Sequence, residues 1–176
     1  MNKAWFLDRD GTIIEDKHYL SDPKNIAILP EAAEAMKAAQ DDGFLLIVIT
    51  NQSGIARGYF DMAEADAVDG RLREMLAEKG VNMTAIYRCP HLPNGIPPYN
   101  IQCNCRKPET GMFSAAIADF DLNPTECIAC GDKFRDVMRL PEIGIPEKNT
   151  GVIDAEHYNN LMDFYTAVKA QAEKGK

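Results

Sequence analysis

The stretch AWFLDRDGTIIED, residues 4–16, decides the fold, because an apolar run of strand length ends there in two aspartates. Side chains two residues apart on a strand point to the same side, so Asp8 and Asp10 can face one crevice at the end of the strand. Gly11 follows directly and lets the chain turn sharply. Two carboxylates held together repel unless a cation joins them, and Mg²⁺ suits this position because it binds carboxylate and carbonyl oxygens. For this stretch taken alone, a solvated acidic turn is the alternative.

The rest of the chain alternates between apolar runs of strand length and helical patterns. Continuous apolarity, as in FLLIVI at residues 44–49, is typical of a parallel strand covered on both faces. Further strands are predicted over residues 84–87, 127–130 and 150–153, and helices over residues 30–42, 62–79, 112–120, 133–140 and 155–173. We therefore expect an α/β fold, a Rossmann-like doubly wound parallel sheet, which binds ligands outside the carboxyl ends of its strands.

The length and charge of the chain limit the classes of protein to which it can belong. Its 176 residues suffice for a single domain, residues 1–176, with a sizeable core. The 19 basic and 27 acidic residues give a net charge of −8, which argues against a nucleic-acid partner. No apolar run approaches the roughly 20 residues of a membrane span, and charges interrupt the N-terminal run. We expect a cytoplasmic protein with no membrane partner.

Polar side chains suited to phosphate chemistry follow the other predicted strands. The strand over residues 44–49 leads into hydroxyl and amide groups, those of Thr50, Asn51, Gln52 and Ser53. After a long loop comes Lys107, a point charge with the reach to a phosphate, preceded by Arg106. The strand over residues 127–130 leads into Asp132, Lys133 and Asp136. The ends of these elements together supply the chemistry that phosphoryl transfer needs.

In this order, the segments FLDRDGT, VITNQSGIARG, CRKPETGM and GDKFRD resemble the four motifs of the haloacid dehalogenase superfamily of phosphohydrolases. The resemblance runs from Phe6 to Asp136. It implies a phosphatase in which Asp8 is the nucleophile that forms an aspartyl-phosphate, and Asp10 is the general acid for the leaving oxygen and then the base for water. It also implies a catalytic Mg²⁺ held by Asp8, the main-chain carbonyl of Asp10, and Asp132.

The resemblance assigns supporting roles to three more residues. Thr50 and Lys107 stabilise the charged transferring group, and Asp136 fits the second acid of the last motif, in support of the metal site. A non-catalytic zinc-loop interaction module built on this fold is a competing hypothesis. The intact set of acids and lysine speaks against it, because a binding scaffold has no need of a nucleophile.

The segment 89–107 carries a second candidate metal site. Cys89, His91, Cys103 and Cys105 supply three sulfurs and one imidazole, the ligand set of a closed structural zinc site. The segment is rich in proline and has no periodicity, so a metal would supply the order that a core cannot. A full ligand set leaves no open position, and we expect no zinc catalysis. Incidental cysteines in a reduced protein are the alternative.

The two remaining cysteines, Cys127 and Cys130, form a CxxC pattern. They lie on a predicted strand, where a spacing of three residues sends them to opposite faces. We expect them to pack in the core, with a redox or metal role as the alternative.

The cysteine loop resembles that of the capless branch of the superfamily, which contains heptose-bisphosphate and histidinol-phosphate phosphatases. Only a helix and a loop fit between the first two motifs, so selectivity must come from the loops over residues 15–21, 53–58 and 89–107. We expect the following side chains to contact the substrate: Asp16, Lys17, His18, Tyr19, Asn51, Gln52, Ser53, Arg57, Arg106 and Lys133.

We expect the substrate to be a small phosphorylated metabolite, D-glycero-D-manno-heptose 1,7-bisphosphate, cleaved at the phosphate on C7. The run TNQSGIARG and the position of Lys133 match the heptose branch. A bisphosphate also leaves one phosphate outside the catalytic residues, where the forked donors of Arg106, helped by Arg57, can bind it.

Two other substrates compete with this one. Histidinol phosphate carries a cationic amine, which Glu15 and Asp16 would favour, and CPHLP at residues 89–93 also fits the histidinol branch. A nucleic-acid end is less favoured, because the net charge is negative and no basic patch with interleaved aromatic residues is present. We expect the protein to be a monomer.

Overall fold

The computed structural model describes residues 1–175, and its strands form one five-stranded sheet. The strands are β1 (Lys3–Leu7), β2 (Phe44–Asn51), β3 (Ala85–Cys89), β4 (Ile128–Gly131) and β5 (Thr150–Val152). They lie in the order β3-β2-β1-β4-β5, and all four pairings are parallel. The predicted α/β fold is therefore confirmed. The direction of chain progression reverses between β1 and β4, which is where open parallel sheets bind ligands.

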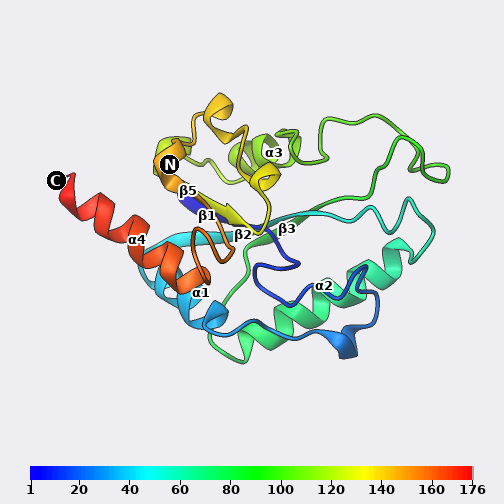
Figure 1. Cartoon of the computed structure of the whole chain (residues 1–176), viewed down its shortest axis with the longest axis horizontal. Helices are drawn as coiled ribbons and strands as arrows, with labels where there is room; N and C mark the ends of the chain where they lie inside the picture. Colours follow the sequence, from blue (N-terminus) through cyan, green and yellow to red (C-terminus); the bar gives the residue numbers. More distant parts are fainter. Residues whose placement is uncertain (176) are drawn as a thin grey trace.

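Four α-helices cover the two faces of the sheet. They are α1 (Ala32–Asp41), α2 (Met62–Ala77), α3 (Gly111–Asp119) and α4 (Leu161–Lys174). Helices α1, α2 and α4 lie on one side of the sheet, and α3 lies on the other (Figure 1). No helix within residues 1–175 is both long and apolar enough to cross a membrane.

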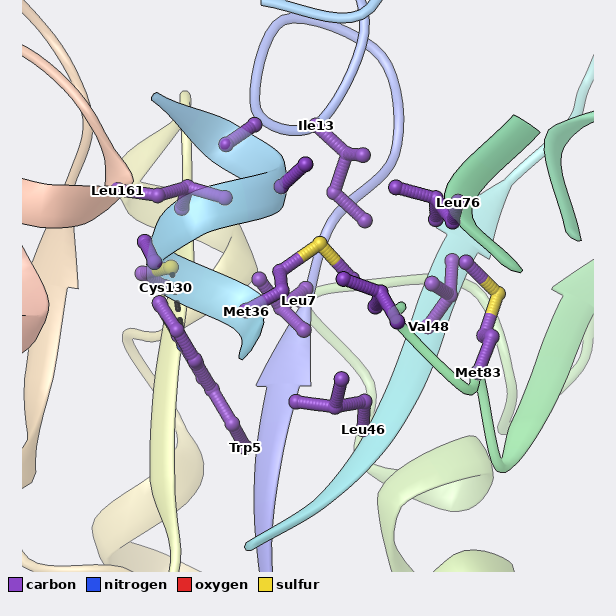
Figure 2. Close-up of a cluster of buried hydrophobic side chains, with 14 of the residues drawn as sticks. Trp5, Leu7, Ile13, Met36, Leu46, Val48, Leu76, Met83, Cys130 and Leu161 are labelled. Atoms are coloured by element: carbon purple, nitrogen blue, oxygen red, sulfur yellow. Dashed lines mark hydrogen bonds between the residues drawn. The ribbon is translucent and has the colours of Figure 1, made fainter. Parts of the chain in front are cut away.

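Alternate residues of the strands enter two separate hydrophobic cores. Trp5 and Leu7 of β1 belong to the larger core beneath α1, whereas Phe6 packs on the α3 side. Figure 2 shows the larger core, in which β1 and β2 side chains lie against Met36 of α1. Burial on both faces explains why these strands are apolar throughout. Cys127 and Cys130 are buried in opposite cores, as predicted.

The chain after β4 departs from the helix predicted over residues 133–140. Two short 3-10 turns stand there instead, η3 (Phe134–Asp136) and η4 (Leu140–Ile143). The carboxylate of Asp136 accepts a hydrogen bond from the N–H of Lys133 at 3.0 Å and is buried, which closes the chain into a tight turn. Pro141 has no N–H with which to continue a helix. The prediction of a helix here was wrong.

The last helix begins later than predicted, at Leu161 rather than at residue 155. Asn160 sets the start, because its side chain accepts a hydrogen bond from the N–H of Asp163 at 2.9 Å. Before it, the carboxylate of Asp154 accepts from the N–H groups of Glu156 and His157 and holds a bend.

The segment between β3 and α3 consists of turns and bends, as its composition predicted. Two main-chain hydrogen bonds join it and the end of β3 to the loop after β2. The N–H of Gln52 donates to the carbonyl of Cys89, the last residue of β3, at 2.8 Å. The N–H of Ile96 donates to the carbonyl of Ala56 at 2.7 Å. Both segments leave the carboxyl edge of the sheet on the same side (Figure 1).

Candidate active site

A buried lysine joins two carboxylates at the carboxyl edge of the sheet. The ammonium group of Lys107 lies 2.9 Å from Asp8 Oδ1, at the end of β1, and 2.7 Å from Asp136 Oδ1 in η3. It also donates to the carbonyl of Ile49 at 2.7 Å. The side chain of Lys107 is only 2% exposed, so its charge is held in place before any ligand arrives.

The charged groups of this cluster shift one another's pKa values. Burial raises the pKa of Asp8 to about 8; Lys107 opposes that rise, and the carboxylates of Asp136 and Asp132 add to it. Burial alone would lower the pKa of Lys107, but Asp8 and Asp136 outweigh burial and raise it. Lys107 is therefore positively charged at neutral pH. One further cation beside Asp8 would stabilise the crowded carboxylates.

The last residue of β2, Asn51, and the residue after it, Gln52, hold Lys107 and Asp10 in position. Asn51 and Lys107 exchange two hydrogen bonds between the Asn51 amide and the Lys107 main chain, at 2.9 and 3.1 Å. The side-chain amide of Gln52 donates to Asp10 Oδ2 at 3.0 Å and to Thr50 Oγ1 at 2.8 Å. Of the amide groups predicted here, that of Gln52 contacts the acidic pair, and that of Asn51 holds the main chain of Lys107.

Two glycines allow the carboxylates to approach the backbone closely. Gly11 has a φ of +78°, and a Cβ there would clash with Asp132 Oδ2. A Cβ on Gly131 would clash with Asp136 Oδ2. Side chains at these positions would displace both acids.

Three of the carboxylates form a group that fits a metal ion. Asp8, Asp132 and Asp136 each offer an oxygen, and these oxygens lie within 4.8 Å of one another. Hard oxygen donors of this kind suit Mg²⁺. The structure therefore places Asp136 beside Asp8 and Asp132 as a further carboxylate that could contact such an ion.

These three carboxylates border a cavity of about 290 Å³. All but two of the predicted catalytic and substrate-binding side chains border it. Thr50 does not border the cavity; it is 1% exposed and accepts a hydrogen bond from Gln52. Lys17 is directed elsewhere and pairs with Glu15 at 2.9 Å.

Four basic side chains besides Lys107 also line the cavity, those of Arg57, Arg106, Lys133 and Arg135. Burial lowers the pKa of Arg106, and the neighbouring charges of Arg135 and Arg57 lower it further. Nη1 of Arg106 is buried and has no hydrogen-bond partner among residues 1–175. An anion placed beside Arg106 would satisfy this donor and offset the repulsion between the arginines.

The loop over residues 15–21 forms the rim of the cavity. His18 and Tyr19 have left-handed φ values of +53° and +66°, and Asp16 stabilises this turn by accepting a hydrogen bond from the N–H of His18 at 2.9 Å. The ring of Tyr19 packs edge-on against Tyr59, with centroids 4.8 Å apart, and lies 5.8 Å from the guanidinium carbon of Arg57. The rim therefore presents aromatic and cationic groups together.

The structure also brings Cys89, His91, Cys103 and Cys105 together, as predicted. Sγ of Cys105 lies 2.8 Å from that of Cys89 and 3.4 Å from that of Cys103, and Nδ1 of His91 lies 3.3 Å from Sγ of Cys105. Burial raises the pKa of the Cys89 and Cys105 thiols. The set is that of a closed tetrahedral metal site, in which a cation would favour the thiolates.

Sequence reasoning missed two features of the site. Arg135 faces the cavity, but the predicted helix gave no reason to direct it there. Arg9 is 1% exposed and joins Asp10 to Asp69 of α2. The sequence did hold a signal for the second feature. Asp69 interrupts the apolar stripe of α2 formed by Ala65, Leu72 and Leu76. A charged residue in such a stripe indicates a buried ion pair, because charged side chains are almost never buried without a partner.

Fold and site together define a phosphatase of the haloacid dehalogenase class, and the comparisons with known proteins agree. A family model described as "Polynucleotide kinase 3 phosphatase" matches residues 3–166. The D-glycero-beta-D-manno-heptose-1,7-bisphosphate 7-phosphatase of Haemophilus ducreyi is 40% identical over 147 residues, which are 83% of this chain and 81% of the relative. The enzyme of that name from Escherichia coli O6:H1 is 35% identical over 180 residues, with 96% of this chain and 95% of the relative covered.

A solved structure extends the similarity to the fold. The D,D-heptose 1,7-bisphosphate phosphatase from B. bronchiseptica, complexed with magnesium and phosphate, superimposes with a TM-score of 0.75 at 28% identity, and the match covers 97% of this chain and 99% of that one. The chain belongs to the polynucleotide kinase 3 phosphatase family, within the haloacid dehalogenase superfamily. It is a phosphatase, and the resemblance seen in its motifs is confirmed.

Proposed function

We propose that this protein is a Mg²⁺-dependent phosphomonoesterase that hydrolyses the C7 phosphate of D-glycero-D-manno-heptose 1,7-bisphosphate through an aspartyl-phosphate on Asp8. The observation that carries the proposal is that one cavity holds both the catalytic group and a further group of cations. Asp8, Lys107 and the neighbouring acids line it, and so do Arg57, Arg106 and Arg135, whose charges lie near one another. The catalytic group can bind one phosphate of a bisphosphate, and the arginines can bind the other. The names of the relatives support the same substrate.

In the proposed reaction, the Asp8 carboxylate attacks phosphorus and the bond from phosphorus to the leaving oxygen breaks. Asp10 gives its proton to that oxygen. Asp10 then takes a proton from a water molecule that attacks phosphorus, and the bond between phosphorus and Asp8 breaks. Lys107 stands 2.9 Å from Asp8 and stabilises the charge on the transferring group throughout.

The residues around Asp8 fit a bound Mg²⁺. Asp8, Asp132 and the main-chain carbonyl of Asp10 are its proposed ligands, with Asp136 as a further carboxylate in the group. When bound, the ion would neutralise charge on the phosphoryl group. The magnesium in the B. bronchiseptica structure supports this cofactor.

The direct test of this function is phosphate release from heptose 1,7-bisphosphate and from histidinol phosphate, each with and without Mg²⁺. We expect the bisphosphate to give the higher kcat/KM and the chelated protein to be inactive. Histidinol phosphate is the weaker candidate, because its cationic amine would meet the basic side chains that line the cavity, whereas Asp16 is the lining acid outside the catalytic group. A higher kcat/KM for histidinol phosphate would overturn the proposed substrate.

Arg106→Ala tests the second phosphate site. Charge-assisted hydrogen bonds of this kind contribute about 1.5–3 kcal/mol, so KM for the bisphosphate should rise about 10- to 100-fold. KM for 4-nitrophenyl phosphate, which has no second phosphate, should stay near that of the wild type. Arg71→Ala, on the exposed side of α2, is the matched control. An unchanged KM for the bisphosphate in Arg106→Ala would show that the second phosphate binds elsewhere.

We also propose that Cys89, His91, Cys103 and Cys105 bind one structural Zn²⁺. The arrangement of three thiols and an imidazole in a segment without regular structure supports this. Lys107 and Arg106 follow Cys105 directly, so the zinc would fix the main chain that carries both cations. The ligand set is complete, and the zinc takes no part in the reaction.

Protein purified without added metal should contain one zinc per chain by elemental analysis. Cys105→Ser should lose the zinc and lower Tm by about 5–10 °C, since each kcal/mol shifts Tm by about 2–4 °C in a chain of this size. Cys127→Ala is the control: its thiol is buried but is not one of the four clustered ligands, and the zinc content of this variant should equal that of the wild type. Zinc-free wild-type protein with freely reactive thiols would contradict the proposal.

Four properties expected from the sequence stay predictions. They are a single domain over residues 1–176, a monomer, a cytoplasmic location, and the absence of nucleic-acid and membrane partners. Size-exclusion chromatography with light scattering tests whether the protein is a monomer. Nucleic-acid binding by the same preparation can be measured at several salt concentrations, because binding to phosphates weakens as salt rises.

A further inference from the structure

A chain of alternating charges leads from Asp10 away from the cavity. Nε and Nη2 of Arg9 donate to the two carboxylate oxygens of Asp10, at 3.1 and 3.2 Å. On its other side, Nη1 of Arg9 donates to Asp69 Oδ1 at 3.0 Å. Asp69 Oδ2 accepts from Nη2 of Arg88 at 2.6 Å, and that nitrogen also lies 2.9 Å from Asp66 Oδ1. Four side chains thus link α2 and β3 to the acid beside the nucleophile.

The middle of this chain is buried and lies outside the cavity. The side chain of Arg9 is 1% exposed and that of Asp69 is 9% exposed, whereas Asp66 at the outer end is 70% exposed. Neither Arg9 nor Asp69 borders the cavity, although Asp10 does. Burying two charged groups costs free energy unless each is paired. Stability alone offers no reason to place this pair behind an acid that faces a ligand.

The geometry gives Arg9 control over the orientation of the Asp10 carboxylate. A carboxylate on a short side chain can rotate, and Gln52 contacts only one of its oxygens. The planar fork of Arg9 contacts both oxygens and so fixes the plane of the group. Arg9 itself is held by Asp69, because no other side chain in the described residues accepts from its Nη1.

We propose that Asp69, acting through Arg9, positions the Asp10 carboxylate for proton transfer to the leaving oxygen. Both are positioning residues, since neither touches the cavity. The inference rests on the proposed function and adds two residues to it. One of these residues, Asp69, lies on the buried face of α2 and not in the lining of the cavity.

The test compares two substrates that differ in their need for a proton. The sugar alkoxide of heptose 1,7-bisphosphate must be protonated as it leaves, whereas 4-nitrophenolate leaves as a stable anion. A fault in proton transfer therefore lowers kcat/KM for the first substrate far more than for the second. A general loss of folding or of phosphate binding lowers both alike.

Arg9→Lys keeps the positive charge but removes the pair of N–H donors that contacts both oxygens of Asp10. Asp69→Asn keeps the shape of the side chain but removes its negative charge. We expect Arg9→Lys to lower kcat/KM for the bisphosphate by about 100-fold and Asp69→Asn by about tenfold, with changes below about threefold for 4-nitrophenyl phosphate. Asp66→Asn, at the exposed end of the same chain, is the matched control and should behave as the wild type.

Equal losses on both substrates, or wild-type kinetics in Asp69→Asn and Arg9→Lys, would overturn the inference. So would the same loss in Asp66→Asn as in Asp69→Asn, because long-range charge would then explain both. The activity of the wild-type protein in the same assay tests the proposed function separately. Wild-type turnover with unaffected variants removes only the positioning role, whereas an inactive wild type removes the proposed function itself.

Discussion

Asp8→Asn is expected to lower phosphate release at least about 10⁴-fold, since losing a nucleophile costs this much or more in enzymes that act through covalent intermediates. The amide has nearly the shape of the carboxylate but no oxygen able to attack phosphorus. Steady-state assay of phosphate from heptose 1,7-bisphosphate with Mg²⁺ measures the effect. Asp41→Asn, at an exposed position of α1, is the control and should retain full activity.

The thermal stability of the same variant separates lost chemistry from lost folding. The pKa of Asp8 in the folded chain, about 8, lies above the ordinary aspartate value of 3.8, so the folded state holds the proton more tightly than the unfolded state. Ionised Asp8 therefore destabilises the metal-free protein as pH rises from about 4 to 8. Metal-free Asp8→Asn should accordingly have a Tm at pH 8 no lower than that of the wild type. Substantial turnover by Asp8→Asn would contradict the assignment of the nucleophile.

Lys107→Met should have the second large effect, on both activity and stability. Its ammonium group lies within 3 Å of Asp8 and Asp136, and the side chain is 2% exposed. Removing one partner of a buried ion pair costs about 3–5 kcal/mol, because the carboxylates are left buried and uncompensated. Loss of a preorganised positive group should also lower kcat by about 10²–10³-fold.

Denaturant unfolding in the absence of metal measures the first effect, and phosphate release measures the second. Lys148→Met, an exposed lysine in the turn before β5, should match the wild type in both. Mg²⁺ should recover part of the lost stability in Lys107→Met, because the ion would replace one positive charge among the acids. Stability and turnover both within experimental error of the wild type would show that the lysine has no such role.

The parts of the molecule that follow from local pattern were predictable from the sequence. β1 and β2 are buried on both faces, so their residues had to be apolar throughout, and the polar residues that follow them had to stand at one edge of the sheet. This reasoning brought Asp8, Asp10, Asn51 and Gln52 together correctly. The cysteine cluster was also predictable, because three cysteines and a histidine in a segment without periodicity are typical of a structural metal site.

The parts that depend on tertiary contacts were not predictable in the same way. The helix expected over residues 133–140 is replaced by 3-10 turns because the Asp136 carboxylate bonds to the main chain of Lys133 and to Lys107, which lies 29 residues earlier in the chain. That contact outweighs helix propensity. The partnership of Arg9 with Asp69 joins residues 60 positions apart, and the sequence holds only the indirect signal of a charged residue in an apolar stripe.

The covalent route through Asp8 is tested most directly by the stereochemistry at phosphorus. A thiophosphate ester substrate made chiral with oxygen isotopes is hydrolysed in water carrying a third oxygen isotope, with Mg²⁺ present, and the configuration of the released thiophosphate is determined. Two successive displacements, first by Asp8 and then by water, predict overall retention. Inversion would mean that water attacks phosphorus in a single step, and would contradict the phosphoenzyme.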